Sequence, residues 1–136
     1  MPKIAPATAE RWFRIVVVLG VASNLLLSIG ALLVPNLVLS LFGISPAYPD
    51  VWVRFSAVLL ILLSFYYLPG AFEPRTHAIN ADLVIVSRAA GVLFFPAMVL
   101  VLDYSPLFLT FAVYDFIWGF PAAVFLSLSR RAPSTS

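Results

Sequence analysis

Cysteine is absent from the sequence, histidine occurs once, and charged residues make up only 10% of the 136 residues. Without cysteine, the chain alone cannot provide thiol redox chemistry, thiolate metal ligands or iron–sulfur ligation. Its single histidine cannot supply both axial ligands of a transmembrane haem. The formal net charge of +2 is too small for nucleic-acid binding, which requires a concentrated basic face. We therefore expect no intrinsic cofactor and no nucleic-acid partner.

Apolar residues dominate instead, at 62% of the chain and a mean hydropathy of +1.05, whereas soluble domains are about 45 to 50% apolar. Continuous apolar stretches cover residues 12–34, 51–69, 81–102 and 106–128. Each is close to or above the roughly 20 residues that a helix needs to cross a bilayer, and none alternates like a barrel strand. The first stretch is too long for a cleavable signal, so we expect it to be retained. The sequence predicts an all-α integral membrane bundle of four transmembrane helices, forming a single domain over residues 1–136.

Basic residues predict the orientation of this bundle. With the N-terminus inside, the inner segments hold Lys3, Arg11, Arg14, Arg75, Arg130 and Arg131. The outer connections at 35–50 and 103–105 hold no lysine or arginine. By the positive-inside rule, we expect both termini to be cytoplasmic, in a bacterial inner membrane. Interfacial aromatic anchors fit the same frame, with Trp12, Tyr66 and Tyr67 on the inner side and Tyr48, Trp52 and Tyr104 on the outer side.

The connection between the first two stretches is apolar but interrupted by Pro35, Pro46 and Pro49. Proline disfavours a continuous helix, so residues 37–43 are predicted to form a short segment lying at the outer interface. A re-entrant pore loop is the alternative, but it needs protein or a watery cavity to cover its backbone.

Three charged residues are candidates for positions inside the hydrocarbon, namely Arg54, Arg88 and Asp115. Each costs about 2.5 to 3.5 kcal/mol on insertion scales, so their presence needs a reason. Helix rise places Asp115 between the two arginines in depth, within reach of their long side chains. Asn24 lies in the middle of the first stretch and could complete the group. We predict that these four residues form a buried polar cluster.

Spacing on the first stretch supports this prediction. Gly20, Asn24, Ser28 and Ala31 recur on one helical face that carries only small or polar side chains. Small residues let helix backbones approach, and asparagine can form hydrogen bonds across the contact. This face is therefore expected to point toward the other helices.

Two interpretations of the cluster stay open. Buried charges can serve only to set helix register and pairing. Alternatively, the cluster binds a ligand such as a quinone, a lipid head group or a carboxylate of a partner protein, with an arginine donating hydrogen bonds. Glu73, His77 and Asp82 could in principle hold a cation, but His77 is expected to be solvated, and we predict no metal site. Catalytic signatures such as G-x-S-x-G or H-E-x-x-H are absent.

Four segments carry a family resemblance: ALLVPNLVLSLFGI (31–44), VWVRFSAVLLILLSFYYLPGAFEP (51–74), SRAAGVLFF (87–95) and YDFIWGF (114–120). In their helix lengths and polar positions they resemble the DoxX-like group of small four-helix membrane proteins. The resemblance implies a membrane bundle that works as a subunit or partner of respiratory-type oxidoreductases.

The leading functional hypothesis is thus a non-catalytic subunit or anchor of a larger, redox-linked membrane complex. A small transporter or a quinone- or lipid-binding protein, acting as a homo-oligomer through the Arg54/Arg88/Asp115 pocket, is the alternative. A membrane enzyme ranks last, because no catalytic group is recognisable.

Overall fold

The computed structural model describes residues 4–131, and these residues form helices and short connections. In chain order the elements are α1 (Pro6–Leu33), α2 (Pro35–Leu41), α3 (Val51–Phe72), α4 (Ala78–Leu102), the short 3₁₀ helix η1 (Pro106–Phe108) and α5 (Leu109–Ser129). Helices α1, α3, α4 and the continuous η1–α5 segment are each long and apolar enough to cross a membrane. The predicted all-α architecture with four membrane-spanning helices is confirmed, and the protein is an integral membrane protein.

All four long helices extend beyond the apolar stretches at one end, and α1 and α3 show why. Helix α1 begins at Pro6 because proline is well suited to the first helical position, where its missing N–H is no loss. Helix α3 continues through Pro69 and ends at Phe72. Its C-cap, Glu73, precedes Pro74, which disfavours further helix. Residues at the helix ends, such as Glu10 of α1 and Gly70 of α3, thus belong to the helices although they lie outside the apolar stretches.

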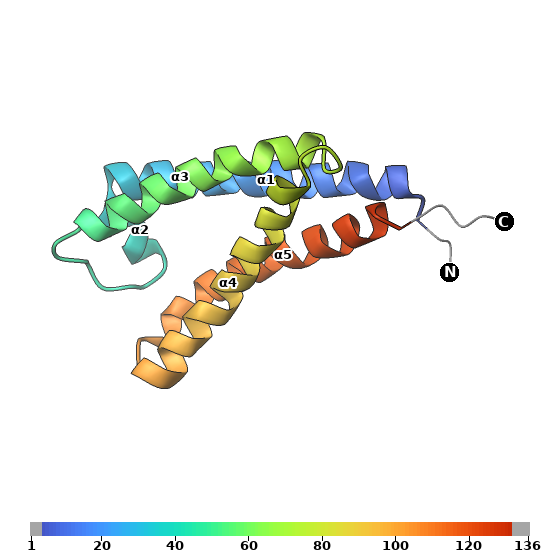
Figure 1. Ribbon diagram of the computed structural model, residues 1–136. Helices are drawn as coiled ribbons and strands as arrows, with labels where there is room; N and C mark the ends of the chain where they lie inside the picture. Colours follow the sequence, from blue (N-terminus) through green and yellow to red (C-terminus); the bar gives the residue numbers. More distant parts are fainter. Residues whose placement is uncertain (1–3, 132–136) are drawn as a thin grey trace.

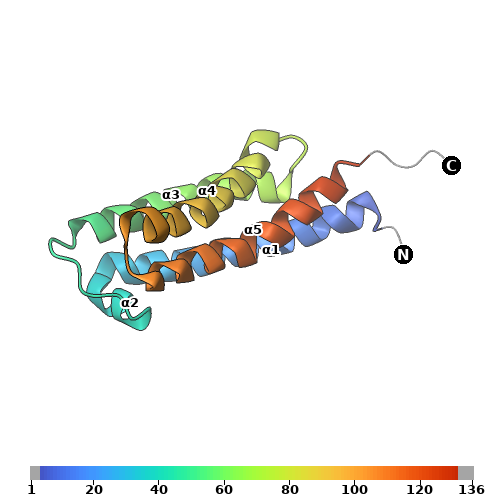
Figure 2. The same cartoon turned by 90° about the horizontal axis from the view of Figure 1, so that it is seen from below.

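The four long helices form two antiparallel pairs. Helices α1 and α3 lie side by side, and α4 and α5 form the second pair (Figure 1). The pairs meet at the end of the bundle where the two termini lie and diverge toward the end that holds α2. A view from below shows α5 running along α1 (Figure 2). Both described chain ends therefore lie on the same side, as an even number of spans requires.

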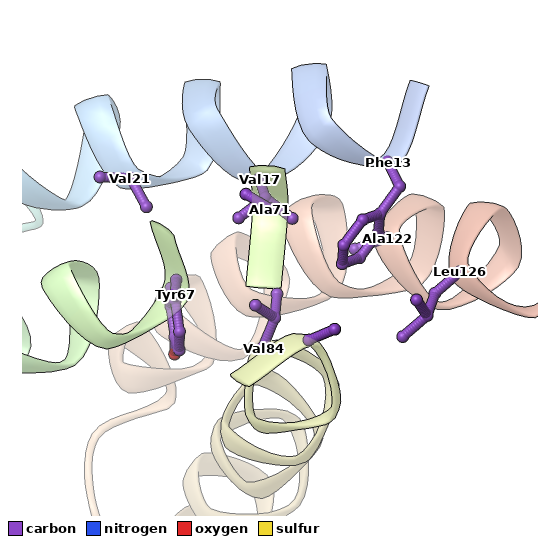
Figure 3. Close-up of a cluster of buried hydrophobic side chains, with 9 residues drawn as sticks. Phe13, Val17, Val21, Tyr67, Ala71, Val84, Ala122 and Leu126 are labelled. Carbon is purple, nitrogen blue, oxygen red and sulfur yellow. The ribbon is translucent and has the colours of Figure 1, made fainter. Parts of the chain in front are cut away.

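The hydrophobic core lies in the half of the bundle near the termini (Figure 3). Its buried residues are Phe13, Val17 and Val21 of α1, Tyr67 and Ala71 of α3, Ala81 and Val84 of α4, and Ala122 and Leu126 of α5. A four-residue spacing keeps the α1 side chains on one face. Alanines on the other three helices let the backbones approach closely. The resulting van der Waals packing holds the helices together, because lipid supplies no hydrophobic driving force between them.

Two arginines join α1 and α3 reciprocally. Arg14 of α1 donates to the carbonyl oxygen of Phe72, at 2.9 Å, and to that of Ala71, at 3.4 Å, both in the last turn of α3. Arg54 of α3 donates in turn to the carbonyl oxygen of Leu32 in the last turn of α1. The last carbonyls of a helix have no partner within it, so each helix receives its C-terminal cap from its neighbour.

The short segment predicted at 37–43 is the helix α2, which ends at Leu41. It lies at the end of the bundle away from the chain ends (Figure 1), and its place at the outer interface rather than in a re-entrant loop stays a prediction. Leu37 and Leu41 are exposed, as an interfacial helix requires. Asn36 accepts a hydrogen bond from the backbone N–H of Ala47 at 2.9 Å, which ties the following connection to α2.

Candidate functional site

Arg88 of α4 and Asp115 of α5 form an ion pair between the two helices. Nη1 of Arg88 lies 2.7 Å from Oδ1 of Asp115, and the side chains are only 6% and 17% exposed. Each residue lies two to three positions from the middle of its spanning helix, about 3 to 4 Å along the axis at 1.5 Å per residue. The charges therefore meet near the membrane centre, where an unpaired charge is most costly.

Two glycines make room for this pair. A Cβ atom on Gly119 would lie 2.7 Å from Cβ of Arg88, and one on Gly91 would overlap Oδ2 of Asp115. Each helix thus presents a glycine opposite the charged residue of the other. This reciprocal arrangement sets the register of α4 against α5.

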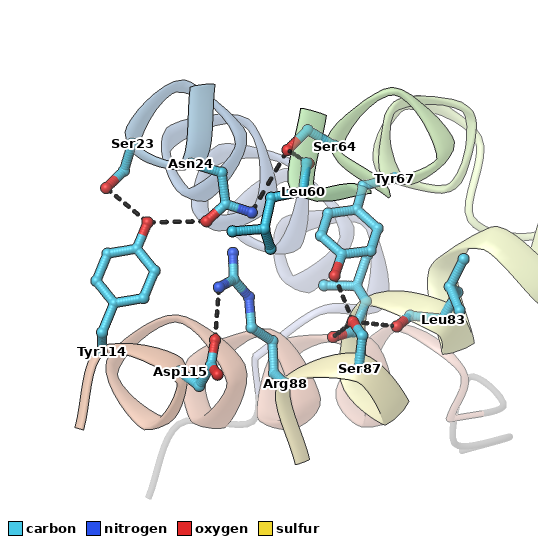
Figure 4. A network of polar contacts seen from close by, with 11 residues as sticks. Ser23, Asn24, Leu60, Ser64, Tyr67, Leu83, Ser87, Arg88, Tyr114 and Asp115 are labelled. Carbon is cyan, nitrogen blue, oxygen red and sulfur yellow. Dashed lines mark hydrogen bonds and ion pairs between the residues drawn. The ribbon is translucent and has the colours of Figure 1, made fainter. Parts of the chain in front are cut away.

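Asn24 of α1 is 2% exposed and joins three helices through hydrogen bonds (Figure 4). The hydroxyl group of Tyr114 donates to Oδ1 of Asn24 at 2.9 Å and lies 2.8 Å from Oγ of Ser23. Nδ2 of Asn24 donates to Oγ of Ser64 on α3 at 3.4 Å. The polar network therefore crosses from one helix pair to the other.

The guanidinium group of Arg88 projects from α4 into the space between the helix pairs (Figure 4). Its Cζ atom lies 5.4 Å from the ring centre of Tyr114 and 5.9 Å from that of Tyr67, within the range of cation–π attraction. Its Nη1 group donates to Asp115, whereas its Nε and Nη2 groups form no hydrogen bond within residues 4–131. Arg88 therefore has N–H donors without an acceptor among these residues, in a low-dielectric environment.

Arg54 does not belong to this group, and its predicted place in the cluster is wrong. It pairs with Asp50 one turn earlier on the same helix, with Nη2 3.1 Å from Oδ2, and its side chain is 41% exposed. Arg54 instead has its partners nearby, Asp50 four residues earlier and the carbonyl oxygen of Leu32 at the end of α1, whereas Asp115 lies on the other helix pair. The site consequently holds one arginine and one aspartate, and its formal charge is zero rather than +1.

A partly open cavity of about 280 Å³ lies between the diverging helix pairs, with α2 at its edge. It is lined by Asn24, Leu27, Ser28, Ala31, Val38, Leu39, Val53, Ser56, Ala57, Leu60, Arg88, Phe95, Phe111, Tyr114 and Asp115. The predicted face of α1 thus points inward. Ser28 is fully buried, and its hydroxyl oxygen has no hydrogen-bond partner among residues 4–131. Most of the wall is apolar, with Arg88 and Ser28 as unsatisfied polar groups.

Sequence reasoning missed five polar residues of these contacts, namely Ser23, Ser64, Tyr67, Ser87 and Tyr114. Tyr67 was predicted to be an interfacial anchor, which is wrong: it is 2% exposed and its hydroxyl group bonds to Ser87, whereas Tyr66 is 61% exposed. The signal was the seven-residue spacing of Ala57, Ser64 and Ala71, because Tyr67 lies on the face that these small residues define.

The residues considered for a cation do not gather. Asp82 pairs with Arg130 at 2.7 Å, and His77 lies 3.9 Å from Glu73 at the surface. Within the part of the chain that the structure describes, no group of three or more histidine or acidic residues is placed to hold a metal ion.

Comparison with known proteins identifies no relative: no family model, no curated protein and no solved structure matches the chain.

Proposed function

We propose that the protein binds an amphipathic, membrane-soluble molecule in the cavity between its helix pairs, as a small transporter or a quinone- or lipid-binding protein. The observation that carries this proposal is the guanidinium group of Arg88, which reaches into the cavity with one hydrogen bond among the described residues. A buried arginine normally satisfies more of its five donors, because each unmade hydrogen bond in a low-dielectric medium is costly.

Two further features support a ligand over a purely structural role. The fully buried Ser28 hydroxyl adds a second unsatisfied group to the same cavity. The volume of about 280 Å³ lies just below the range of about 300 to 1,000 Å³ typical of small-molecule sites. A head group and the first part of a chain would fit, and the rest of the chain would extend into the bilayer.

Filling the cavity tests this proposal. Ala31 lines it, whereas Ala22 lies on the exposed side of the same helix. Intact-protein mass spectrometry of protein extracted from its native membrane should find a stoichiometric small molecule on the wild type and on Ala22→Phe. Ala31→Phe should lose it, because the phenyl ring occupies the space. Equal occupancy in the two variants would place the ligand elsewhere and contradict the proposal.

A subunit role in a larger, redox-linked membrane complex is the second candidate. The resemblance to DoxX-like proteins supports it, and so does the surface of α4. The buried residues of this helix, Ala81, Val84 and Arg88, all belong to its first half, and apolar residues such as Leu93 and Leu100 are exposed in the second. Stoichiometric partner chains in the same mass spectra would support this role, and a protein carrying no other subunit would contradict it.

We further propose that the end bearing both termini faces the cytoplasm of a bacterial cell. Arg11, Arg14, Arg75, Arg130 and Arg131 lie in the helix ends and connection on that side, whereas Lys3 lies outside the described residues. The connection between α2 and α3, which contains Ser45, lies at the opposite end and holds no lysine or arginine.

Single cysteines test this orientation cleanly, because the chain has none of its own. Ser45 and Thr76 are exposed and lie in connections at opposite ends. A membrane-impermeant maleimide added to whole cells should label Ser45→Cys, and it should label Thr76→Cys only after permeabilisation. The reverse pattern would invert the proposed topology.

A further inference from the structure

The charge of the cavity indicates what kind of head group it takes. Because Arg54 pairs with Asp50 at the end of the bundle, Arg88 and Asp115 are the two formal charges that line the cavity, and they cancel. A charged head group bound to Arg88 would leave one net charge in an apolar enclosure. Burying such a charge without a compensating partner costs far more than burying a neutral polar group.

The polar groups without hydrogen-bond partners further limit the chemical class of the head group. Nε and Nη2 of Arg88 can donate to an oxygen atom, and Ser28 can donate or accept. Oδ2 of Asp115 also forms no hydrogen bond to the described residues. An oxygen that accepts from Arg88 and, as a hydroxyl, donates to Asp115 or Ser28 would satisfy the polar part of the cavity without adding charge.

We infer that the ligand is an uncharged amphiphile whose head group carries a hydrogen-bond-accepting hydroxyl or carbonyl oxygen, rather than an anionic or cationic lipid. This inference rests on the proposed function, since it names the ligand class of the same cavity. It assigns Arg88 the role of a hydrogen-bond donor to the head group, with Asp115 holding the charge balance of the site at zero.

A matched set of sixteen-carbon compounds tests the inference on the full chain in lipid nanodiscs. Binding of tritiated hexadecan-1-ol is competed with hexadecane-1-sulfonate, hexadecyltrimethylammonium and hexadecane, and nanodiscs with Ala31→Phe define the background of partition into lipid. We expect unlabelled hexadecan-1-ol to compete at least ten-fold better than each of the other three. Better competition by either charged compound would overturn the inferred class, and equal competition by hexadecane would remove any role for the head group.

The isosteric variant Asp115→Asn should reverse the order in which the alcohol and the sulfonate compete. Asp115→Asn leaves the positive charge of Arg88 without its counter-charge, so the sulfonate should now compete better than the alcohol. Should this variant fail to fold, the charge-free double variant Arg88→Met/Asp115→Leu replaces it, and there the alcohol should lose its advantage over hexadecane. Retention of the wild-type order in the variant that is measured would contradict the inference.

Failure of the proposed function is distinguishable from failure of the inferred class. If hexadecan-1-ol binds wild type no better than the Ala31→Phe background and no competitor changes the signal, the cavity is not a binding site, and both proposals fail. If binding is specific but the order of competitors differs, only the class of head group is wrong.

Discussion

Replacing Asp115 with leucine is expected to destabilise the bundle by about 3 to 5 kcal/mol, because it leaves the charge of Arg88 buried without a counter-charge. Two aromatic rings within 6 Å of the guanidinium offset part of this cost but carry no formal charge. Reversible unfolding of the purified protein in mixed micelles, followed by circular dichroism, measures the change.

The double variant Arg88→Met/Asp115→Leu is the control for this prediction. Removing both charges and keeping apolar side chains of similar size is often neutral or stabilising for a buried pair. Its stability should return to within about 1 kcal/mol of the wild type, on the small cost of volume-conserving apolar replacements. A double variant as unstable as the single variant would show that the charges do not act as a pair.

The second large effect is expected at Gly70, where α3 and α4 cross most closely. A Cβ atom on Gly70 would overlap the backbone of Asn80 and Ala81, and backbone atoms cannot move aside as a side-chain end can. Gly70→Ala should therefore force the helices apart and cost about 1 to 3 kcal/mol, as overpacking generally does. The same unfolding measurement gives the value.

Gly20 supplies the matched comparison on α1. A Cβ atom there would lie 3.5 Å from the ring of Trp118, which is ordinary van der Waals contact. Gly20→Ala should stabilise the protein by up to about 1 kcal/mol, the gain in helix propensity of alanine over glycine. Equal effects of the two substitutions would mean that the close crossing of α3 and α4 does not exist.

Helix number and approximate boundaries could be predicted from the sequence, because long apolar runs and the rise per residue leave few alternatives in a membrane. The cost of burying charge likewise identified Arg88 and Asp115 before any contact was known. Depth in the membrane alone, however, could not show which residues Arg54 contacts. Asp50 is the N-cap residue of α3, and an i, i+4 partner of this kind competes with any partner at matching depth on another helix.

The divergence of the two helix pairs could not be predicted. Hydrophobic periodicity gives the face of a helix but not the distance to its neighbour. Alanines such as Ala71 and Ala122 draw the helices together near the termini. At the opposite end the tilted rings of Phe95 and Phe111 pack with their centres 5.2 Å apart, and Phe42 contacts Phe111 from the connection after α2. Phe95 and Phe111 line the cavity, whereas small side chains pack the helices together near the chain ends.

A crystal structure of the protein purified from its native membrane would show directly what occupies the space between the helix pairs. We expect an elongated molecule in the cavity, with a head-group oxygen about 3 Å from the guanidinium group of Arg88. Helix pairs packed together along their whole length, with Arg88 hydrogen-bonded only by protein groups, would contradict this expectation.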